Sequence, residues 1–587
     1  MVAFGGGIYR NRPGGRPERP SRLSDSVHHQ LYMYALASRE RARRKIITSS
    51  RTRLFNLARS FGVGSALVVA LWLATAIASP AQTFTTLVSF DGTDGANPNA
   101  GLVQGRDGSY YGITTNGGTN RSVCVNDCGT VFKITPTGTL TSLYSFCAQT
   151  RCPDGDTPYA GLVQGTDGNF YGTTWYGGAN SSACYGLGCG TVFKITSGGT
   201  LTTLYSFCAQ KNCTDGAYPQ DRLVLGTDGN LYGTTDFGGS GYHGTVFKIT
   251  PAGKLTTLRS IWPNGIHAGR LVQGRDGNFY GTTLGGGRVG GTVFKITPSG
   301  KLTTLYSFCS QSRCTDGYYP NGLLQGSDGD FYGSTFGGGA YHNSPCNDFR
   351  GCGTIFQISP AGTLTTLYSF CAQTDCPDGY NPVAVVQATD GNFYGPTSNG
   401  GANNYGTIFQ ITPTGTLTTL YSFCPNGYPC ADGTNPDAGL VQGTNGNFYG
   451  TTPTGGASTA CDSGCGPVYG LSVGLGPFVS FVRSSGKVGW KVEILGQGFK
   501  GTTGVSFDGT AANFVVHSAT YLTATVPQGA TTGFVTVTTP GGTLQSNIPF
   551  RVTQWHSEPL GNHEYAQYLG GLSLSYLVQP SRVLRSC

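Results

Sequence analysis

The chain has 587 residues, with 94 glycines, 30 prolines and 19 cysteines, and only 11% of its residues are charged. Glycine is therefore about 16% of the chain, roughly twice its usual share, but it lacks the three-residue period of collagen. Because 38% of the residues are hydrophobic and 12% aromatic, the chain can bury a core, and wholesale disorder is excluded. Many short strands joined by tight turns fit this composition best.

The formal net charge of +8 comes from the N-terminal segment. Residues 1–60 contain 13 Lys and Arg and 3 acidic residues, which leaves 37 − 13 = 24 basic and 29 − 3 = 26 acidic residues elsewhere. The rest of the chain therefore has a net charge of −2. A basic patch that would predict nucleic acid as a partner is missing from it.

A hydrophobic run, residues 62–78, follows this basic segment. A basic segment, an apolar run and an Ala-x-Ala-like site such as Ala76-Ile-Ala78 are typical of a secretory signal peptide. The alternative is an uncleaved signal anchor, because the run is close to membrane-spanning length. We predict a basic leader extension over 1–60 and the signal-peptide core with its cleavage site, or the anchor, over 61–82. The protein is then secreted or held at the cell surface, with membrane contact only through an uncleaved leader.

From residue 83 onward one unit is repeated seven times. The clearest marker is an Asp-Gly turn, replaced by Asn-Gly in the last unit, which begins at Asp107, Asp167, Asp228, Asp276, Asp328, Asp390 and Asn445. By subtraction the spacings are 60, 61, 48, 52, 62 and 55 residues. Periods of this size indicate a propeller, a solenoid or a linear array.

Each unit divides into four short strands, which in the second unit cover residues 162–164, 170–174, 191–195 and 201–207. Asp-Gly between two apolar runs is a strong hairpin signal, because both central residues of a type I′ turn need a positive φ. Four-stranded units repeated radially form a β-propeller. The alternative, a parallel β-helix, has shorter and less hairpin-like repeats.

The first and last strands of the array complement each other. The array begins with a lone strand of the fourth type, residues 84–90, and ends on a strand of the third type, residues 467–471. Seven units are complete only if the N-terminal strand joins the last one. We therefore predict an all-β chain whose residues 83–473 form a seven-bladed β-propeller of four-stranded blades, with the N-terminal strand closing the last blade.

Eighteen of the 19 cysteines occupy two slots of the unit, always in pairs. After the fourth strand come Cys147 with Cys152, Cys208 with Cys213, Cys309 with Cys314, Cys371 with Cys376, and Cys424 with Cys430. Before the third strand come Cys124 with Cys128, Cys184 with Cys189, Cys346 with Cys352, and Cys461 with Cys465. Both members of a pair are missing together wherever a slot is vacant, which is what a covalent pair in an oxidising compartment predicts.

Metal binding and redox activity are the alternatives for these cysteines. Cys-x₃–₅-Cys has no second pair or histidine at zinc spacing within the unit, and redox-active pairs are more typically Cys-x-x-Cys. We predict nine structural disulfides, no metal and no cofactor, with Cys587 left over.

Alternation of strand direction places the Asp-Gly turns on one face of the propeller and the variable, cysteine-stapled loops on the other, which we call the stapled face. Function tends to lie on variable loops held by a rigid scaffold. The residues on these loops that depart from the repeat are the predicted ligand-binding residues: Trp175, Tyr176, Arg222, Phe237, Trp262, His267, Arg270 and Phe336. Aromatic rings and arginine can stack on and hydrogen-bond a sugar or a peptide. The alternative is that the rings cover loop bases and the arginines pair with local aspartates.

Two polar residue types recur in the units. A glutamine on the first strand (Gln104, Gln164, Gln273, Gln325, Gln387 and Gln442) either lines the central channel or bonds the neighbouring blade. A tyrosine on the second strand recurs in every unit, so we expect it to pack rather than to bind. The repeats hold no HExxH, Gly-x-Ser-x-Gly or phosphate-loop motif. We therefore predict no catalytic residue and no enzyme.

The repeat stops near residue 474, and residues 477–552 read as short alternating strands, typical of a small sandwich. This stretch resembles the IPT/TIG family of immunoglobulin-like domains through Gly496-Gln-Gly-Phe499, Val526-Pro527 with Gly529 and Gly533, and the Phe550/Val552 ending. The resemblance implies spacing, packing or protein contact rather than catalysis.

The repeat array resembles the GloVer-type tandem-repeat family of bacterial exported proteins through Asp-Gly-Asn-Phe-Tyr-Gly and Gly-Thr-Val-Phe-Lys-Ile, which recur over residues 84–471. The resemblance implies a surface or secreted location, often with a C-terminal anchor. Residues 553–587 depart from this pattern, because they contain no anchor-length apolar run, and we predict a disordered tail there. The favoured function is binding of a glycan or a surface protein on the stapled face. A purely structural surface protein and an enzyme acting on polysaccharide are the alternatives.

Overall fold

The computed structural model describes residues 82–553, except 121–123, 125–127, 181, 183, 262–264, 287–289, 343–345 and 347–350. The predicted leader, the signal-peptide run and Cys587 lie outside the described residues. Within that part of the chain, the regular elements are β-strands and two short 3-10 helices, η3 (Lys211–Cys213) and η4 (Ser312–Cys314). None of the helices found there is long and apolar enough to cross a membrane.

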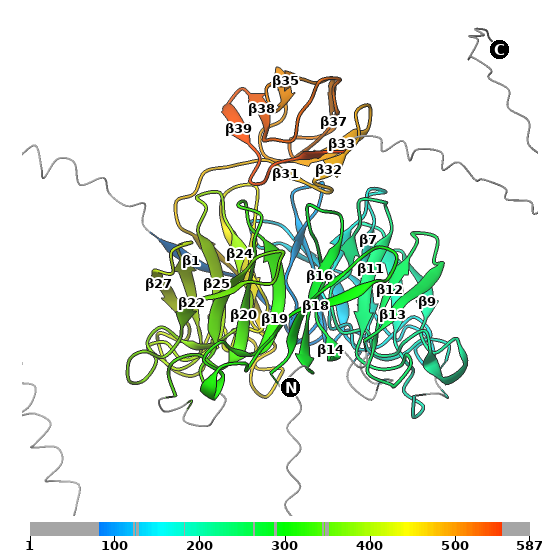
Figure 1. Cartoon of the computed structure of the whole chain (residues 1–587), viewed down its shortest axis with the longest axis vertical. Coiled ribbons are helices and arrows are strands. Elements are labelled where there is room, and N and C mark those ends of the chain that lie inside the picture. The colour runs from blue at the N-terminus through cyan, green and yellow to red at the C-terminus, as the bar shows by residue number, and fades with distance from the viewer. Residues whose placement is uncertain are drawn as a thin grey trace, which may run out of the picture. The chain divides into compact units, whose positions relative to one another are not determined.

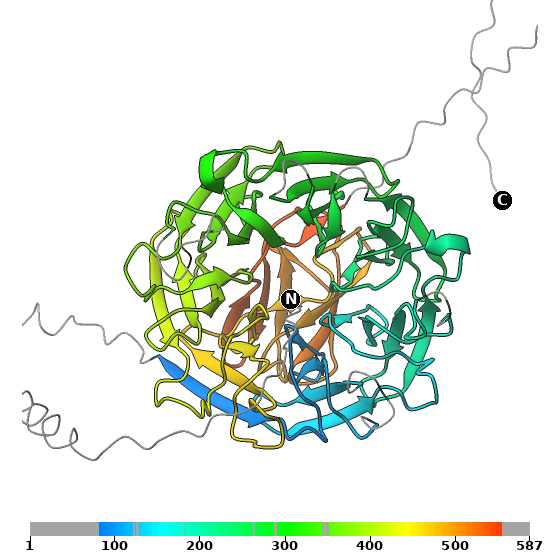
Figure 2. The ribbon, with the colours of Figure 1, turned by 90° about the horizontal axis from the view of Figure 1, so that it is seen from below.

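The repeats form seven antiparallel sheets, which we number as blades 1–7 and which follow one another around a centre in Figure 2. Blade 1 contains β2 (Val103–Gln104), β3 (Tyr110–Thr114), β4 (Thr130–Ile134) and β5 (Leu140–Ser145). Blade 2 contains β6 (Val163–Gln164), β7 (Phe170–Thr174), β8 (Thr191–Ile195) and β9 (Leu201–Ser206). Blade 3 contains β10 (Val224–Leu225), β11 (Leu231–Thr235), β12 (Thr245–Ile249) and β13 (Leu255–Ser260). The chain is therefore all-β and propeller-like.

Blades 4 and 6 differ from the predicted four strands, because their first strand is split into two pieces that pair with the same neighbour. Blade 4 contains β14 (Ile266–Ala268), β15 (Val272–Gln273), β16 (Phe279–Gly285), β17 (Thr292–Ile296) and β18 (Leu302–Ser307). Blade 6 contains β23 (Tyr380–Pro382), β24 (Val386–Gln387), β25 (Phe393–Asn399), β26 (Thr407–Ile411) and β27 (Leu417–Ser422). In blade 5 the equivalent strand is continuous, and the elements are β19 (Tyr318–Gln325), β20 (Phe331–Gly337), β21 (Thr354–Ile358) and β22 (Leu364–Ser369).

Blade 7 joins the two ends of the repeat array. It contains β28 (Val441–Gln442), β29 (Phe448–Thr451) and β30 (Pro467–Ser472), and its outer strand is β1 (Thr83–Ser89), the first strand of the chain. β1 pairs with β30 from Thr83↔Ser472 to Ser89↔Pro467. The predicted pairing of the N-terminal strand with the last repeat is therefore present.

Burial explains why the two central strands of each blade have nearly invariant sequences. All five residues of β7 are buried, and β8 exposes only Lys194 in part. Blade 2 also needs a glycine in β7, because a Cβ at Gly172 would lie 2.5 Å from the Phe193 ring of the paired strand. The outer strand β9 packs on one side only, so it tolerates threonine and serine.

Aromatic rings join successive blades at their cores. The ring of Tyr111 in blade 1 stacks on Phe170 in blade 2 at 4.0 Å, and Tyr280 in blade 4 lies 4.1 Å from Phe331 in blade 5. The hydroxyl of the same tyrosine donates to the Asp-Gly turn of its own blade, as Tyr111 does to Asp107 at 2.9 Å. The recurrent tyrosine therefore has the packing role that its repetition predicts.

The recurrent glutamine bonds the preceding blade. Gln273 accepts from the backbone N of Thr227 at 2.9 Å, and Gln325 accepts from the backbone N of Arg275 at 2.9 Å. The same bond joins the first and last repeats, where Gln104 accepts from the backbone N of Thr444 at 3.0 Å. Of the two predicted roles, the structure assigns five of the six glutamines to inter-blade hydrogen bonding. Gln164 is the exception, because it donates to Gly168 of its own blade and its Oε1 has no partner among the described residues.

The residues after the repeats form two four-stranded sheets around one core, which we call the C-terminal sandwich (Figure 1). One sheet contains β31 (Ser480–Phe481), β33 (Lys491–Leu495), β37 (Tyr521–Thr525) and β36 (Phe514–Val516). The other contains β35 (Thr510–Ala511), β34 (Gly504–Phe507), β38 (Val535–Thr539) and β39 (Gly542–Gln545). A short parallel pair, β32 (Ser485–Gly486) and β40 (Arg551–Val552), completes it. Buried residues of both sheets, such as Ile494 and Val537, share the core.

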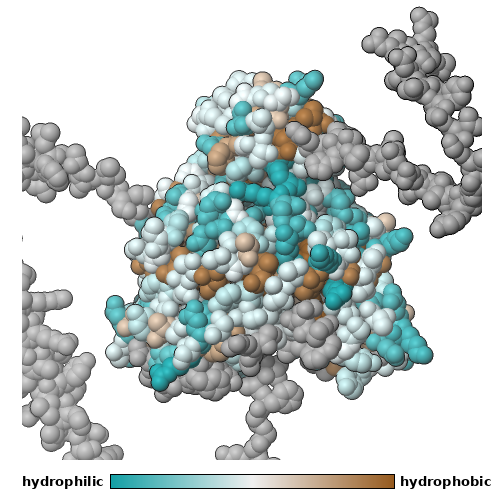
Figure 3. Space-filling view, viewed as in Figure 1, coloured by the Kyte–Doolittle hydropathy of each residue, from teal (hydrophilic) through white to brown (hydrophobic). Residues whose placement is uncertain are grey.

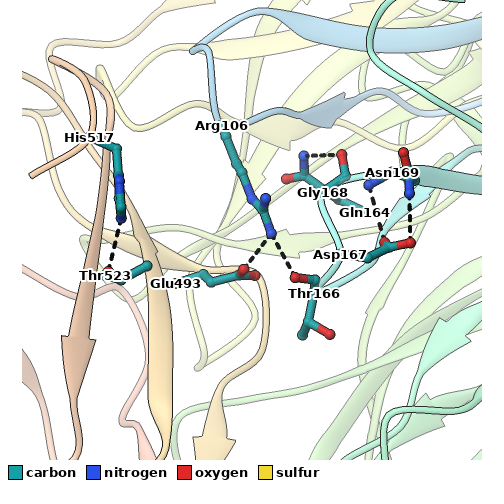
Figure 4. A network of polar contacts seen from close by, with 9 residues as sticks. All are labelled: Arg106, Gln164, Thr166, Asp167, Gly168, Asn169, Glu493, His517 and Thr523. Carbon is teal, nitrogen blue, oxygen red and sulfur yellow. Dashed lines mark hydrogen bonds and ion pairs between the residues drawn. The ribbon is translucent and has the colours of Figure 1, made fainter. Parts of the chain in front are cut away.

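The C-terminal sandwich contacts the Asp-Gly turns of the repeats (Figure 4). Arg106, which precedes the turn of blade 1, forms an ion pair with Glu493 of β33 and donates to the carbonyl oxygen of Thr166 at 2.8 Å. Its guanidinium also lies over the Tyr521 ring, 5.0 Å from the centroid. Gln497 adds a bond of 2.9 Å to Thr444 in blade 7. The Asp-Gly turn face is therefore partly covered, and the stapled face receives none of these contacts.

The ring of Phe84 provides a test of how strongly β1 holds blade 7 together. It stacks on Tyr421 of blade 6 at 3.9 Å and on Tyr469 of β30 at 5.2 Å. We expect Phe84→Ala to lower the free energy of unfolding by about 3 kcal/mol, because a packed aromatic side chain is lost. Urea titration measures this change. Thr86→Ala, at an exposed position of the same strand, is the control, and equal effects of the two variants would contradict the packing role.

Glu493 makes the contact between the sandwich and the repeats sensitive to pH. Burial raises the pKa of this carboxyl to about 7, against the opposing charges of Arg106 and Arg483. Because the folded pKa lies above the unfolded value, the stabilisation is complete below about pH 4.5 and is lost as the pH rises through 7. We expect Glu493→Gln to gain on the order of 2 kcal/mol relative to the wild type between pH 5 and pH 8, measured by urea unfolding at both values. A difference that does not change with pH would contradict this prediction.

Candidate functional site

Nine disulfides staple the loops within the described part of the chain, with Cα–Cα separations of 4.0–5.5 Å. They join the same pairs that the repeat slots predict: Cys124 with Cys128, Cys147 with Cys152, Cys184 with Cys189, Cys208 with Cys213, Cys309 with Cys314, Cys346 with Cys352, Cys371 with Cys376, Cys424 with Cys430, and Cys461 with Cys465. Each one closes a loop of a few residues. These bonds are consistent with folding in an oxidising, extracellular compartment.

Many of these cysteines are buried although they belong to the variable loops. Cys128, Cys376 and Cys465 are fully buried, and Cys430 is only 2% exposed. Cys128, Cys376 and Cys465 also belong to the hydrophobic cores of their blades. A disulfide carries no charge and no strong hydrogen-bond donor, so its sulfur atoms can pack as small apolar groups do. At these four positions the disulfide is therefore part of the blade core and offers no surface to a ligand.

In three blades both slots are filled, and the structure brings the two cysteine pairs together. In blade 2 the Sγ atoms of Cys184 and Cys208 lie 3.8 Å apart, and all four Sγ atoms of Cys184, Cys189, Cys208 and Cys213 lie within 4.8 Å of one another. The spacing of these cysteines along the chain does not reveal this proximity. The two pairs are distant along the chain, but the hairpin between β8 and β9 returns one to the other. Four reduced thiols there would have the number and proximity that zinc requires.

The other two blades with two filled slots bring only three sulfur atoms this close among their described residues. In blade 1 the group is Cys124, Cys147 and Cys152, and in blade 5 it is Cys346, Cys352 and Cys371. Cys128 and Cys376, the fourth cysteines of these blades, are in neither group. Among the described residues, four cysteine Sγ atoms therefore lie close enough for a four-thiol site in blade 2 but not in blades 1 and 5.

Removing one staple tests the disulfides directly. We expect the double variant Cys208→Ser/Cys213→Ser to lose about 2 kcal/mol of stability, because the bond restricts only a short loop in the unfolded chain. Denaturant unfolding measures the loss, with the wild type in reductant as the reference. Alkylation and mass spectrometry should find the eighteen slot cysteines oxidised in the wild type. Free thiols with co-purified zinc would contradict the assignment of disulfides.

Aromatic side chains of blades 2, 3 and 4 contact one another in a continuous row, which we call the aromatic chain. It runs Tyr159–Trp175–Tyr218–Phe237–His267, with Tyr176 beside Tyr218. The ring centroids are 5.7 Å apart for Tyr159–Trp175, 6.5 Å for Trp175–Tyr218, 5.6 Å for Tyr218–Phe237 and 5.3 Å for Phe237–His267. The Phe237 side chain is 42% exposed. Four predicted ligand-binding residues therefore meet in one group.

The backbone of the repeat positions these rings at the loop ends of the blades. Isolated bridges, Asp156↔Tyr176 and Ala217↔Phe237, extend the inner hairpins of blades 2 and 3 toward the stapled face. Tyr218 and His267 occupy a position where φ is positive, at 57° and 50°. The matching residues of blades 1, 6 and 7 are Asn97, Asn381 and Asn435, and asparagine tolerates this conformation best. Tyr218, His267 and Tyr319 replace it in blades 3, 4 and 5, and Thr157 replaces it in blade 2.

A buried aspartate and a histidine adjoin the aromatic chain. His267 Nδ1 lies 3.6 Å from Asp236 Oδ2, and the Asp236 side chain is only 6% exposed. The hydrogen bond to Asp236 raises the pKa of His267, whereas burial raises the pKa of Asp236. Burial also raises the pKa of Asp221 to about 7, and the Asp236 charge adds to this effect while Arg270 opposes it. This corner of the site can therefore exchange protons near neutral pH.

Arg222 and Arg270 occupy one position of the repeat in neighbouring blades, just before the inner strand. In the other five blades this position holds a small residue: Gly101, Gly161, Gly322, Ala384 or Gly439. The position forms a crowded inner ring, since a Cβ at Gly161 would lie 2.7 Å from the carbonyl oxygen of Gly101. Burial lowers the pKa of Arg222 to about 9, and repulsion from Arg270 contributes. Among the described residues, neither guanidinium has a hydrogen bond or an ion pair.

Two of the predicted site residues do not join this group. Trp262 lies outside the described residues. Phe336 is half-buried in blade 5, where its carbonyl oxygen accepts from the Asn381 side chain at 2.7 Å. Its ring makes no contact with the aromatic chain among the described residues.

Sequence reasoning also missed four members of the site: Tyr159, Tyr218, Asp221 and Asp236. A signal for two of them was present in the repeat. Asp221-Arg222 replaces the Ala-Gly of Ala160-Gly161 and Ala438-Gly439, and Tyr159 stands where blade 7 has Asp437. A comparison of residue size at each position of the seven units would therefore have identified blades 2 and 3 as part of the candidate site.

The two cavities described for the chain lie elsewhere. One, of about 270 Å³, lies on the Asp-Gly turn face between blades 3 and 4 and is lined by Asp228, Gln273 and Asp276. The other, of about 220 Å³, lies beside Glu493 and is lined by Thr166, Arg483 and Lys491. The aromatic chain lines neither of them.

Solved structures similar to this chain belong to several kinds of protein. A fungal alcohol oxidase of the AA5 family in complex with copper covers 80% of this chain and 99% of its own, with 13% identity and a TM-score of 0.47. The extracellular domain of a putative hybrid two-component system from B. thetaiotaomicron covers 79% and 57%, with 12% identity and a TM-score of 0.42. A putative gluconolactonase covers 68% and 94%, with 10% identity and a TM-score of 0.32. None of the curated proteins compared with this chain matches it.

The repeats themselves match a known family model. The Gloeobacter/Verrucomicrobia repeat matches residues 75–211, 126–346 and 346–491. These overlapping matches extend over most of the chain and include all seven blades. The chain therefore belongs to the family of Gloeobacter/Verrucomicrobia repeat proteins.

Proposed function

We propose that this chain is an exported or cell-surface module that binds a glycan or a protein through the aromatic chain on its stapled face. In this proposal the seven blades form a closed β-propeller, and the C-terminal sandwich is an immunoglobulin-like domain of the IPT/TIG kind. The pairing of β1 with β30 and the Gln104–Thr444 bond between blades 1 and 7 support closure. The two sheets around one core support the immunoglobulin-like assignment.

The observation that carries the proposal is the concentration of unusual residues in blades 2–4. The other blades have Asn, Ser, Gly or Ala at many of the corresponding positions, so repetition of the fold does not require aromatic or charged residues there. Aromatic faces with adjacent hydrogen-bonding groups are a common means of holding sugars and peptides. The sandwich contacts the opposite turns through Arg106 and Thr444, which leaves these loops to bind a ligand.

A structural role at the cell surface is the second candidate. Figure 3 shows apolar atoms in small groups separated by hydrophilic ones on the side it draws, rather than one broad apolar surface. A polysaccharide-acting enzyme is the third candidate. It is favoured by the carboxyls of Asp221 and Asp236, because the Asp236 charge helps to raise the pKa of Asp221.

A binding screen with the purified chain, against polysaccharides and surface proteins, tests the proposal. We expect Trp175→Ala to weaken binding of any ligand found by about tenfold or more, because a stacking surface is removed. Phe336→Ala is the matched control: it removes a ring at the equivalent loop of blade 5 and should leave the dissociation constant unchanged. The absence of any bound ligand in the screen would contradict the proposal. Release of reducing ends from a bound polysaccharide, abolished by Asp221→Asn, would instead favour the enzyme.

A further inference from the structure

The proposed binding site contains two cations that form no ion pair with any of the described residues. Arg222 and Arg270 are the only members of their inner ring of seven positions with a side chain larger than alanine. Gly439 shows how closely this ring is packed, because a Cβ there would lie 3.2 Å from the Cβ of Ala384. Two long side chains therefore occupy a position where close packing favours glycine or alanine.

The two guanidinium groups also lie close enough to repel each other. The charge of Arg270 contributes to the lowered pKa of Arg222, and no acid compensates Arg222 in the same way. Asp221 attracts Arg270 but forms no ion pair with it within the described residues, and Asp236 is bonded to His267. Each arginine therefore keeps its N–H donors available for a ligand.

An anion between the two arginines would remove this repulsion. A guanidinium presents a planar fork of donors that matches the oxygens of a carboxylate or a sulfate, and charge-assisted bonds of this kind are stronger than neutral ones. Solvent reaches both arginines although the blades crowd around them, since Arg222 is half-buried and Arg270 is exposed. The two arginines belong to blades 3 and 4, which also carry Phe237 and His267 of the aromatic chain.

We propose that the ligand of this site is an anionic glycan, in which a carboxylate or sulfate ester binds between Arg222 and Arg270 while a sugar ring stacks on the aromatic chain. This inference depends on the proposed function and specifies its ligand. The anion and the ring act together, because the arginines alone would accept any small anion and the rings alone would accept neutral sugars.

Two matched pairs of polymers test the inference with the purified full chain. The first pair is a polyuronate and the same polymer after reduction of its carboxylates to hydroxymethyl groups. The second is a sulfated galactan and its desulfated form. We expect the anionic member of at least one pair to bind about tenfold tighter than its neutral form at moderate salt. The pair that shows this difference identifies the anion as carboxylate or sulfate.

Substitutions of the two arginines test whether the preference for anionic polymers arises at this site. Arg222→Gln and Arg270→Gln should each reduce the preference for the anionic polymer to less than threefold, and Arg270→Lys should retain part of it. Arg259→Gln, on the exposed outer strand of blade 3, is the charge-matched control and should leave the preference intact. Equal binding of charged and neutral polymers, still weakened by Trp175→Ala, would overturn the anion inference and leave the proposed function standing. Absence of binding by all four polymers would overturn the inference, and the wider screen would then decide the proposed function.

Discussion

The pairing of β1 with β30 is the interaction on which the arrangement of the repeats depends. A row of β-sheets has two exposed edges, each with unpaired N–H and C=O groups and an uncovered apolar face. Here the outer strand of the last sheet comes from the start of the chain, so the first and last repeats cover each other. Gln104 bonding to Thr444, and Tyr110 packing on Tyr449 at 4.1 Å, repeat at this junction the contacts found between the other blades.

This arrangement separates the parts of the molecule that must be regular from the parts that can vary. The Asp-Gly turns, the recurrent tyrosine and the recurrent glutamine hold successive blades together, so they change little from unit to unit. The loops at the other ends of the strands carry none of these bonds. Short disulfides hold many of them in place, and their length and composition are therefore free to differ.

The departures from the repeat have a physical cost, which makes them informative. Arg222 and Arg270 have no ion-pair partner among the described residues, and Tyr218 and His267 have a backbone conformation that suits asparagine better. A chain selected for stability alone would keep the small or amide residues of its other blades. Arg222, Arg270, Tyr218 and His267 belong to the adjacent blades 3 and 4, although Tyr319 of blade 5 has the same backbone conformation. The aromatic side chains among them contact one another, which is the reason to regard the group as a binding site.

Repetition made much of this protein predictable from its sequence. The four-strand unit, the local cysteine pairs and the role of β1 follow from comparing seven copies, because each copy must satisfy the same hydrogen bonds and pack against the same neighbour. The membership of the site was only partly predictable: Trp175, Tyr176, Phe237 and His267 stand out by residue type, whereas Tyr159 and Asp236 do not. Tertiary structure alone decided that Phe336 lies apart from the aromatic chain and that two cysteine pairs meet in blade 2. It also decided that cysteines such as Cys128 and Cys465 are buried in blade cores, and that Arg222 and Arg270 form no ion pair with the described residues. These outcomes depend on distances between loops and blades, which the spacing of residues along the chain does not determine.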